Sequence, residues 1–430
     1  TIADARTMKV EKQFQTITAN GYKGKADGRA FLGVNEHKGY MGTSNGIFIL
    51  DLDELEFTDF IKVPGDDEDL YTGQVGNMVR AGDYVFANHQ SAGLLVIDPE
   101  TDQILQSIKP NDALVSTMTL ANDGNLWLMS GGKLVKLDPN TLEMETIDVP
   151  ANVKLTSEGW GAWRASTFCA SRQQNALYWV SADGALEDKG DVVFKYDIDK
   201  GDVSNFIQLP EAEGWSIYGS GFRIDPVTDE AIMCLFKTYG SQDYITRKYN
   251  AQGEKILELE MEKNYWFPAL PIYPDNAAPV VTPLEAQTVA LGETAEVSLA
   301  NLAEDADNMT AAIVKTVKAV SDAEVLTATI KGGKLLLEGL AEGTATVTIQ
   351  VNSNGQLAET EVAVEVTAPV STVASFEDFA LAPESYWAGD EDGDDWYYGL
   401  GYQQRFKSGG YSFVNYCIPD YQTWIGYAVS

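Results

Sequence analysis

The sequence predicts an all-β protein: a β-propeller over residues 1–275, then an immunoglobulin-like (Ig-like) β-sandwich, then a further β-rich module. Three observations lead to this prediction. A phrase repeats through the first 275 residues, alternating strands follow a proline-rich joint, and the composition changes near residue 370. Helical periodicity is rare, because apolar residues alternate with polar ones and Gly or Asn interrupts them about every 8–12 residues.

The repeated phrase consists of an apolar strand, an Asp or Asn at a turn, and an alternating strand. An Asp in that place accepts a hydrogen bond from the backbone two residues on and closes a tight turn. We therefore favour a structural role over a catalytic one for Asp51, Asp98, Asp138 and Asp197, which share this place. The copies read ILDLDELEFTDFI (49–61), VIDPETDQILQSI (96–108), KLDPNTLEMETI (136–147), KYDIDKGDVSNFI (195–207) and, more loosely, RKYNAQGEKILEL (247–259).

Another strand pair precedes most copies, as in GNMVRAGDYVFANH at 76–89. Together they form four-stranded units spaced by roughly 40–60 residues, which is typical of propeller blades. Five blades are readable, and MKVEKQFQTI (8–17) and NYWFPALPIY (264–273) are expected to share a closing blade. Since a row of blades closes on itself to lose its edges, we expect either a six-bladed ring or a seven-bladed ring whose start is missing.

The prolines of PDNAAPVVTPLEAQ (274–287) indicate a linker. Short alternating strands follow, including a hairpin pattern around Gly332-Gly333 and another around Asn354-Gly355. They predict an Ig-like sandwich over 276–369, for which a spacer role is expected. Residues 370–430 are aromatic and acidic and predict the opening of a jelly-roll-like module that the chain includes only in part.

The charge balance excludes some classes of partner. The formal net charge is −34, which disfavours nucleic acid and anionic lipid surfaces. The chain has three cysteines without a CxxC pair and two histidines, so neither a zinc knuckle nor a polyhistidine metal site is expected. Residue 1 is Thr, from which we expect a processed precursor or a fragment.

No nucleophile elbow, P-loop, Rossmann fingerprint or HExxH motif is present. Closely spaced carboxylates around Gly393 make Asp390, Asp392 and Asp394 the candidates for a metal, with Ca²⁺ the expected ion. A solvated acidic loop is the alternative reading of this cluster. We expect no catalytic residues and no resident cofactor.

Aromatic residues gather in segments that connect blades or join their middle strands, such as EGWGAWR (158–164) and ANHQSAG (87–93). Tyr and Trp provide rigid contact area with a polar tip, which suits a broad amphipathic ligand. Packing between blades is the alternative role for each of them. The ligand-binding candidates at the propeller mouth are Tyr71, His89, Gln90, Trp160, Trp163, Arg164, Trp215, Tyr218, Tyr239, Tyr244 and Trp266.

The blade phrases, the closing segment YWFPALPIYPD and the Ig-like spacer resemble the YncE-like surface propellers of Gram-negative gut commensals. Some of these are BtuG-type lipoproteins, which capture cobalamin for an outer-membrane transporter. The tail, through Phe376-Glu377-Asp378, Tyr386-Trp387, Ser408-Gly409-Gly410 and Trp424, resembles the start of a BtuH-like cobalamin-binding domain.

This resemblance implies a non-enzymatic binding protein of the cell surface, held on the outer membrane by an N-terminal lipid outside these residues. Cobalamin (vitamin B12) would be its transported ligand and a BtuB-like TonB-dependent outer-membrane transporter its partner. Two alternatives stay open, because a fold alone does not fix a function. One is a glycan-binding propeller of a polysaccharide-uptake system, and the other is a lyase or hydrolase on the same scaffold.

Overall fold

The computed structural model describes residues 1–4, 7–25, 30–43, 46–63, 75–153, 155, 168–181, 190–237, 243–260, 276–368, 403–408, 411–418 and 423–429. These residues form strands, turns and three short 3₁₀ helices: η1 (Pro110–Asp112), η3 (Glu211–Glu213) and η4 (Thr310–Ala312). No helix that could span a bilayer is found among them. Contacts divide the chain into two units, Thr1–Thr367 and Ala368–Ser430.

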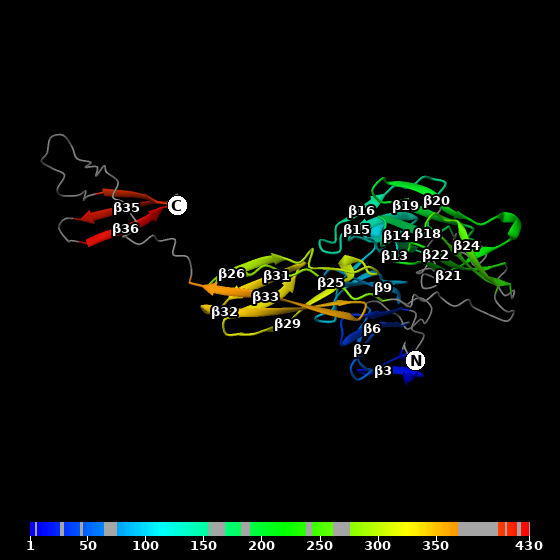
Figure 1. Ribbon diagram of the computed structural model, residues 1–430, viewed down its shortest axis with the longest axis horizontal. Helices are drawn as coiled ribbons and strands as arrows, with labels where there is room; N and C mark the ends of the chain where they lie inside the picture. Colours follow the sequence, from blue (N-terminus) through cyan, green and yellow to red (C-terminus); the bar gives the residue numbers. More distant parts are fainter. Residues whose placement is uncertain are drawn as a thin grey trace. The chain divides into compact units, whose positions relative to one another are not determined.

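Five consecutive four-stranded antiparallel sheets form the blades of a β-propeller (Figure 1). Each blade uses its four strands in chain order, and the first strands of successive blades contact one another as the innermost strands of the ring. The blades are β5 (Ala30–Gly33), β6 (Lys38–Thr43), β7 (Gly46–Asp51), β8 (Glu56–Lys62); β9 (Val75–Ala81), β10 (Tyr84–His89), β11 (Gly93–Asp98), β12 (Gln103–Ile108); β13 (Val115–Leu120), β14 (Leu126–Ser130), β15 (Lys133–Leu137), β16 (Met144–Ile147); β17 (Phe168–Ala170), β18 (Ala176–Val180), β19 (Val192–Asp197), β20 (Asp202–Gln208); and β21 (Ser216–Ile224), β22 (Ala231–Phe236), β23 (Tyr244–Tyr249), β24 (Lys255–Glu260).

The middle strands of the blades make the core. All five residues of β14 and of β18 are buried, whereas the fourth strands β12 and β16 contain no buried residue. A middle strand packs against neighbouring blades on both faces, so its residues are apolar throughout and do not alternate. This difference explains why the second and third strands appear in the sequence as continuous apolar runs.

The repeated aspartate closes the turn between the third and fourth strands, as predicted. The Oδ1 atoms of Asp51, Asp98 and Asp138 accept the N–H of the residue two positions on, at 2.9, 2.9 and 2.8 Å. Asn250 does the same in the loose fifth copy, accepting from Gln252 at 3.0 Å. Asp197 accepts instead from the N–H of Lys200, three positions on.

Two short hairpins precede the first blade: β1 (Ile2–Ala3) pairs with β2 (Val10–Lys12), and β3 (Thr16–Ala19) pairs with β4 (Tyr22–Lys25). Ile17 and Ala19 of β3 pack on Phe48 and Phe60 of the first blade. The segment expected to complete a closing blade with them, 264–273, lies outside the described residues.

The sandwich has a four-stranded sheet in the order β26 (Gln287–Ala290), β33 (Gln356–Thr367), β32 (Gly343–Ser353), β29 (Val314–Val320). A three-stranded sheet of β27 (Thr294–Ser298), β31 (Lys334–Gly339) and β30 (Leu326–Lys331) faces it, and β25 (Val280–Val281) pairs with β28 (Ala303–Glu304). Both predicted hairpin turns are present, and Asn354-Gly355 and Gly332-Gly333 have positive φ angles, as such turns require. The alternating valines of β32 and β33 fill the core between the sheets.

The second unit contains one antiparallel sheet of β34 (Gln403–Ser408), β35 (Tyr411–Ile418) and β36 (Thr423–Val429). The chain is therefore all-β, with a propeller, a sandwich and a β-rich C-terminal unit. The C-terminal cluster of Asp390, Asp392 and Asp394 lies outside the described residues.

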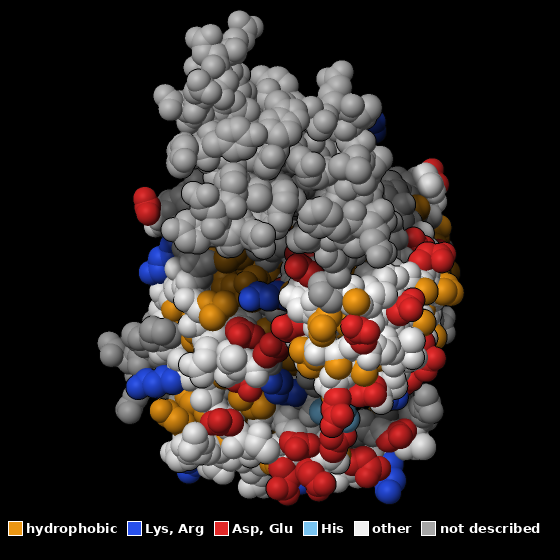
Figure 2. Space-filling model, turned by 90° about the vertical axis from the view of Figure 1, so that its left-hand side faces the viewer, with side chains coloured by type: hydrophobic (Ala, Val, Ile, Leu, Met, Phe, Trp, Pro, Cys, Tyr) orange, Lys and Arg blue, Asp and Glu red, His pale blue; other side chains and the backbone are white. Residues whose placement is uncertain are grey.

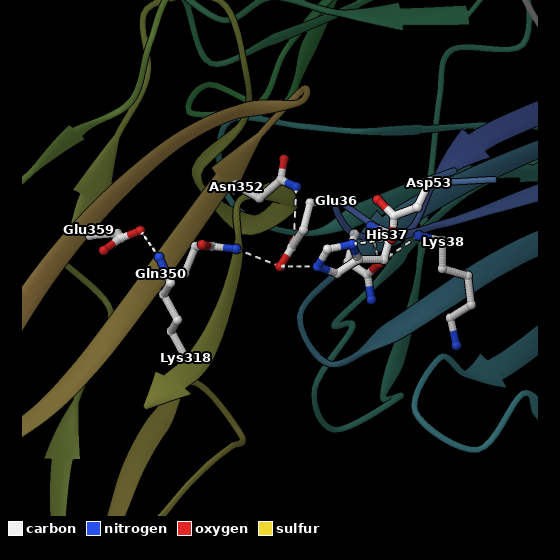
Figure 3. A network of polar contacts seen from close by, with 9 residues as sticks. Glu36, His37, Lys38, Asp53, Lys318, Gln350, Asn352 and Glu359 are labelled. Atoms are coloured by element: carbon white, nitrogen blue, oxygen red, sulfur yellow. Dashed lines mark hydrogen bonds and ion pairs between the residues drawn. The ribbon is translucent and has the colours of Figure 1, made fainter. Parts of the chain in front are cut away.

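Within the first unit, the sandwich packs against one end of the propeller. This end carries the turns between the first and second strands of each blade, and we call it the sandwich-facing end. Here the N–H of Gly82 donates to the carbonyl of Ala311 at 3.0 Å, and the N–H of Gly332 donates to Asp83 at 2.6 Å. Glu36 accepts hydrogen bonds from the side chains of Gln350 and Asn352 (Figure 3).

Candidate functional site

The opposite end of the propeller is the end at which the innermost strands begin and the second strands end. We call this end the mouth. The antiparallel order of each blade brings the connections between blades and the turns between second and third strands to it. Of the candidate residues in the described part of the chain, His89, Gln90, Trp215 and Tyr244 lie at or beside these connections and turns. The sandwich packs against the opposite end.

The turn after β10 is built around His89, whose side chain is wholly buried. Its Nδ1 atom accepts the N–H of Ala92 at 3.0 Å and that of Ser91 at 3.3 Å. A ring nitrogen that accepts is unprotonated, so the neutral ring carries its proton on Nε2. The side chain of this predicted ligand-binding residue thus fixes the shape of the turn.

Gly93 ends the same turn at a φ of +94°, and a Cβ atom on it would lie 2.6 Å from the carbonyl oxygen of Ile108. Only glycine fits at this point, because any side chain would meet the backbone of the fourth strand. The turn from His89 to Gly93 is therefore held from two sides, and its position at the mouth is fixed.

Two buried amide oxygens beside His89 have no hydrogen-bond partner among the described residues: Oδ1 of Asn88 and Oε1 of Gln90. Asn88 is 2% exposed and lies opposite Asn77 of the innermost strand β9. The side-chain amide of Asn77 donates a hydrogen bond to the carbonyl of Met118 in the next blade, at 3.1 Å. A buried acceptor without a partner costs about 1–3 kcal/mol, so a group that donates to Asn88 and Gln90 would be favoured here.

Trp215 lies at the mouth end of the fifth blade, directly before β21. Its ring is half-buried against the core between the fourth and fifth blades, and Lys237 Nζ lies 4.8 Å from the ring centroid. The next residue, Ser216, is 1% exposed, and its buried hydroxyl oxygen has no hydrogen-bond partner in the part of the chain that the structure describes. The mouth therefore presents an aromatic face, a cation and a further unpartnered polar atom.

A buried arginine positions this tryptophan. Arg247 of β23 bonds to Glu213 of η3 and, through Nε at 2.7 Å, to Glu258 of β24. The two carboxylates raise the pKa of the guanidinium although burial opposes its charge. The ion pair with Glu213 holds η3 against the blade, two residues before Trp215.

The other predicted mouth residues divide into two groups. Tyr244 is 5% exposed and packs with Cys234 and Phe236, so its ring contributes to blade packing, the alternative role expected for it. Its contact with a ligand stays a prediction. The backbone of Tyr218 belongs to β21, but its side chain is not described. The remaining predicted residues lie outside the described part of the chain: Tyr71, Trp160, Trp163, Arg164, Tyr239 and Trp266.

Sequence reasoning missed Asn88, Ser216, Lys237 and the ion pairs of Arg247. Only Arg247 carries a recognisable sequence signal, because a charged residue inside the strand YITRKY needs a buried partner. The others depend on contacts between blades.

Two clefts lined by described residues, of about 620 and 870 Å³, lie at the sandwich-facing end. Arg80, Asp83 and Lys315 line both of them, and burial lowers the pKa of Arg80 and of Lys315. None of the buried polar atoms without a partner in the described residues belongs to a residue that lines either cleft. We therefore favour the mouth over these clefts as the functional site.

Within the described ranges, no group of three or more His, Cys, Asp or Glu side chains is placed to hold a metal ion. Acidic side chains are more frequent than basic ones on the face shown in Figure 2, as the net charge of −34 requires.

Comparison with known proteins gives a family for the propeller. Residues 1–274 match the model of a family described as a domain of unknown function, DUF5074. No curated protein matches the chain.

Solved structures resemble the chain distantly. A quinoprotein alcohol dehydrogenase-like protein from Bacteroides thetaiotaomicron is 17% identical, with a TM-score of 0.41 over 56% of this chain and 57% of that one. The extracellular domain of a protein described as a one-component system, from the same organism, is 10% identical, with a TM-score of 0.41 over 85% of this chain and 47% of that one. The chain thus spans about half the length of these structures.

Proposed function

The chain belongs to the DUF5074 family, and we propose that it is a non-enzymatic binding protein of the cell surface that captures a corrinoid, vitamin B12, at the mouth of its propeller. In this proposal it delivers the corrinoid to a BtuB-like TonB-dependent transporter of the outer membrane. The corrinoid is cargo and not a cofactor.

The observation that carries the proposal is the set of buried acceptors at the mouth. Oδ1 of Asn88 and Oε1 of Gln90 in the second blade lack a donor among the described residues, and Trp215 offers an aromatic face at the same end of the fifth blade. A corrinoid is a flat ring edged with primary amides, whose N–H groups are donors. Such a ligand matches aromatic contact area together with amide acceptors.

The placement of the sandwich supports the same reading. It contacts the sandwich-facing end through Gly82, Asp83 and Glu36, and so it packs on the end opposite the mouth. A spacer domain bound at the sandwich-facing end would leave the mouth directed toward a transporter.

Binding without turnover is favoured by the chemistry of the described mouth residues. His89, the usual residue for proton transfer near neutral pH, uses Nδ1 to accept from its own turn. The other groups are amides, a hydroxyl, a tryptophan and a lysine, which bind and orient a ligand.

Titration with cyanocobalamin tests the proposal directly, because the corrin absorbs visible light. We expect saturable binding with one corrinoid per chain, which Asn88→Leu weakens and Asn140→Leu, an exposed asparagine in a turn at the other end of a blade, does not. A parallel panel of polysaccharides should give no saturable binding and no products. Saturable glycan binding without corrinoid binding would replace this proposal by the glycan-binding alternative, and product formation would replace it by the enzyme.

The partner requires a separate test. We expect the full-length protein to carry a lipid and to co-purify from outer membranes with a TonB-dependent barrel. Recovery of an unlipidated protein alone from the periplasm would contradict the delivery step and leave ligand capture standing.

A further inference from the structure

Two basic residues lie at inward-facing positions where the sandwich meets the propeller. Lys315 of β29 is directly opposite Val351 of β32, and Val351 is wholly buried in the core of the sandwich. Arg80 of β9 is directly opposite Val85 of β10, which is wholly buried in the core between the first two blades. Residues directly opposite each other in an antiparallel pair share one face of the sheet, so both cations occupy places where an apolar residue is expected.

The described residues supply no counter-ion to either cation. Lys315 takes part in none of the ion pairs or side-chain hydrogen bonds found among them. Arg80 donates from Nε to the carbonyl of Gly82 at 3.3 Å. Burial lowers the pKa of the Lys315 ammonium group, and it lowers that of Arg80 although the Asp83 carboxylate opposes the change. An uncompensated cation at a half-buried position lowers the stability of the fold, so its presence needs another explanation.

Both cations line the two clefts between the propeller and the sandwich. The wider cleft, of about 870 Å³, has the size of a site for a small organic ligand. The chain contains 64 acidic and 30 basic residues, yet basic residues are at least as frequent as acidic ones among the charged residues that line each cleft. The clefts are therefore more favourable to an anion than the strongly acidic chain as a whole.

The chemistry of the cleft indicates which anion fits. A guanidinium group can donate two parallel N–H bonds to a carboxylate or phosphate, and an ammonium group adds a compact positive charge. Asp83, Asp98 and Glu100 also line the wider cleft. They repel a second negative charge, so a singly charged carboxylate fits better than a phosphate dianion. Thr316 and Thr329 line the same cleft, and their hydroxyl groups suit a polar ligand such as a sugar acid.

We propose that Arg80 and Lys315 bind the carboxylate of a small polar acid, of the class of sugar acids, in the cleft between the propeller and the sandwich. Arg80 comes from the propeller and Lys315 from the sandwich, so a bound carboxylate links β9 to β29 and stabilises their junction. This site is separate from the mouth and does not depend on the function proposed for the mouth.

The test uses the whole 430-residue chain at constant ionic strength. It is titrated with D-glucuronate, with the uncharged counterpart D-glucose, and with inorganic phosphate. We expect calorimetry to show saturable binding of one D-glucuronate per chain, together with a rise in the unfolding temperature. D-Glucose should give neither response, and phosphate should bind more weakly than D-glucuronate.

Variants of the two cations locate the site. Lys315→Met and Arg80→Met should each lower the D-glucuronate affinity at least tenfold. Lys315→Met should also raise the unfolding temperature of the ligand-free protein, since methionine removes the uncompensated charge and keeps a long apolar side chain. The matched control is Lys318→Met on the same strand, which should leave the affinity unchanged, because Lys318 is exposed and forms an ion pair with Glu359 (Figure 3).

Three results would overturn the proposal. One is an unaltered chain that shows no saturable binding of D-glucuronate, or that responds equally to D-glucose. The second is an affinity that Lys315→Met and Arg80→Met leave intact, which would assign both side chains to packing. The third is tighter binding of phosphate than of D-glucuronate. If a variant fails to fold, the comparison of D-glucuronate with D-glucose in the unaltered chain still decides.

Discussion

The two ends of the propeller differ in how their buried polar groups are hydrogen-bonded. At the sandwich-facing end, Arg172 and Glu36 have partners for the groups that the sandwich brings to them. At the mouth, Asn88, Gln90 and Ser216 have buried oxygens for which the described residues supply no partner. Folding alone explains the first arrangement, because paired groups stabilise a junction. The second arrangement lowers the stability of the fold. A ligand that supplies the missing donors would explain why these acceptors are present.

The comparison predicts separate phenotypes for the two ends: variants at the sandwich-facing end should change stability, and variants at the mouth should change affinity. Oxygens of Asn175, Asp305 and Asp307 at the sandwich-facing end also lack partners among the described residues, so the contrast between the ends depends on the paired groups of Arg172 and Glu36.

The largest effect is expected for Arg172→Ala. This change removes hydrogen bonds to Asp305, Asn308 and Asn122 and leaves buried carbonyls unpaired. We expect the free energy of unfolding to fall by about 3 kcal/mol, measured by urea denaturation, with an unchanged affinity for cyanocobalamin. Lys200→Ala, which removes an exposed ion pair with Asp197, is the control and should leave the urea midpoint unchanged. A loss of corrinoid affinity in Arg172→Ala would break the distinction between the ends.

Trp215→Ala tests the mouth. If the ring is a central contact for the ligand, its loss should weaken binding by about 2 kcal/mol, or roughly thirtyfold. Tyr84→Ala is the matched control, since Tyr84 begins β10 at the sandwich-facing end, and it should leave the dissociation constant unchanged. A large loss of stability with normal binding would assign Trp215 to blade packing.

The same assay applies to Trp160 and Trp163, which the sequence predicts at the mouth. Replacing both with Ala should weaken binding by about 2 kcal/mol and leave the thermal midpoint nearly unchanged. An unchanged affinity with a lower midpoint would place both rings in the packing between blades.

Asn88→Leu gives a sharper contrast, because it should raise the stability of the fold and lower the affinity for cyanocobalamin. Leucine has a similar volume and removes the unpartnered oxygen, so the free energy of unfolding should rise by about 1 kcal/mol. Cyanocobalamin affinity should fall about tenfold, since an amide donor of the ligand would then face a methyl group. Denaturation and titration of the same preparation check both. Lower stability in this variant would mean that the amide has a structural role.

The architecture could be predicted from the sequence because its causes are local. Asp51, Asp98 and Asp138 bond to residues two positions away, so the turn is visible in any one copy. Asn354-Gly355 likewise specifies its own hairpin. The two ends of the propeller follow from strand order alone, which is why the described candidates His89, Gln90 and Trp215 lie at one end.

The state of individual side chains could not be predicted in the same way. Tyr244 is buried because of the face of β23 on which it lies and what packs there. Asn88 lacks a partner because Asn77 is engaged with the next blade, and Asp307 meets Ala277, 30 residues earlier in the chain. Such contacts depend on the assembled ring and junction, and they decide which polar residues are available to a ligand.

The smallest effect concerns pH at the mouth. Lys255 and Arg247 hold the pKa of Glu258 below its ordinary value of 4.5, so the folded protein binds a proton at this carboxylate less readily than the unfolded chain does. Its contribution to stability is therefore complete above about pH 4.5 and disappears as the pH falls through the lower folded value. Glu258 is exposed to solvent, so the contribution should be only a few tenths of a kcal/mol. We expect Glu258→Gln to lower the urea midpoint slightly at pH 7 and to match the unaltered protein near pH 3. A difference that persists at pH 3 would show that Glu258 holds Arg247 through hydrogen bonding and not through charge, and that Glu213 alone fixes the helix before Trp215.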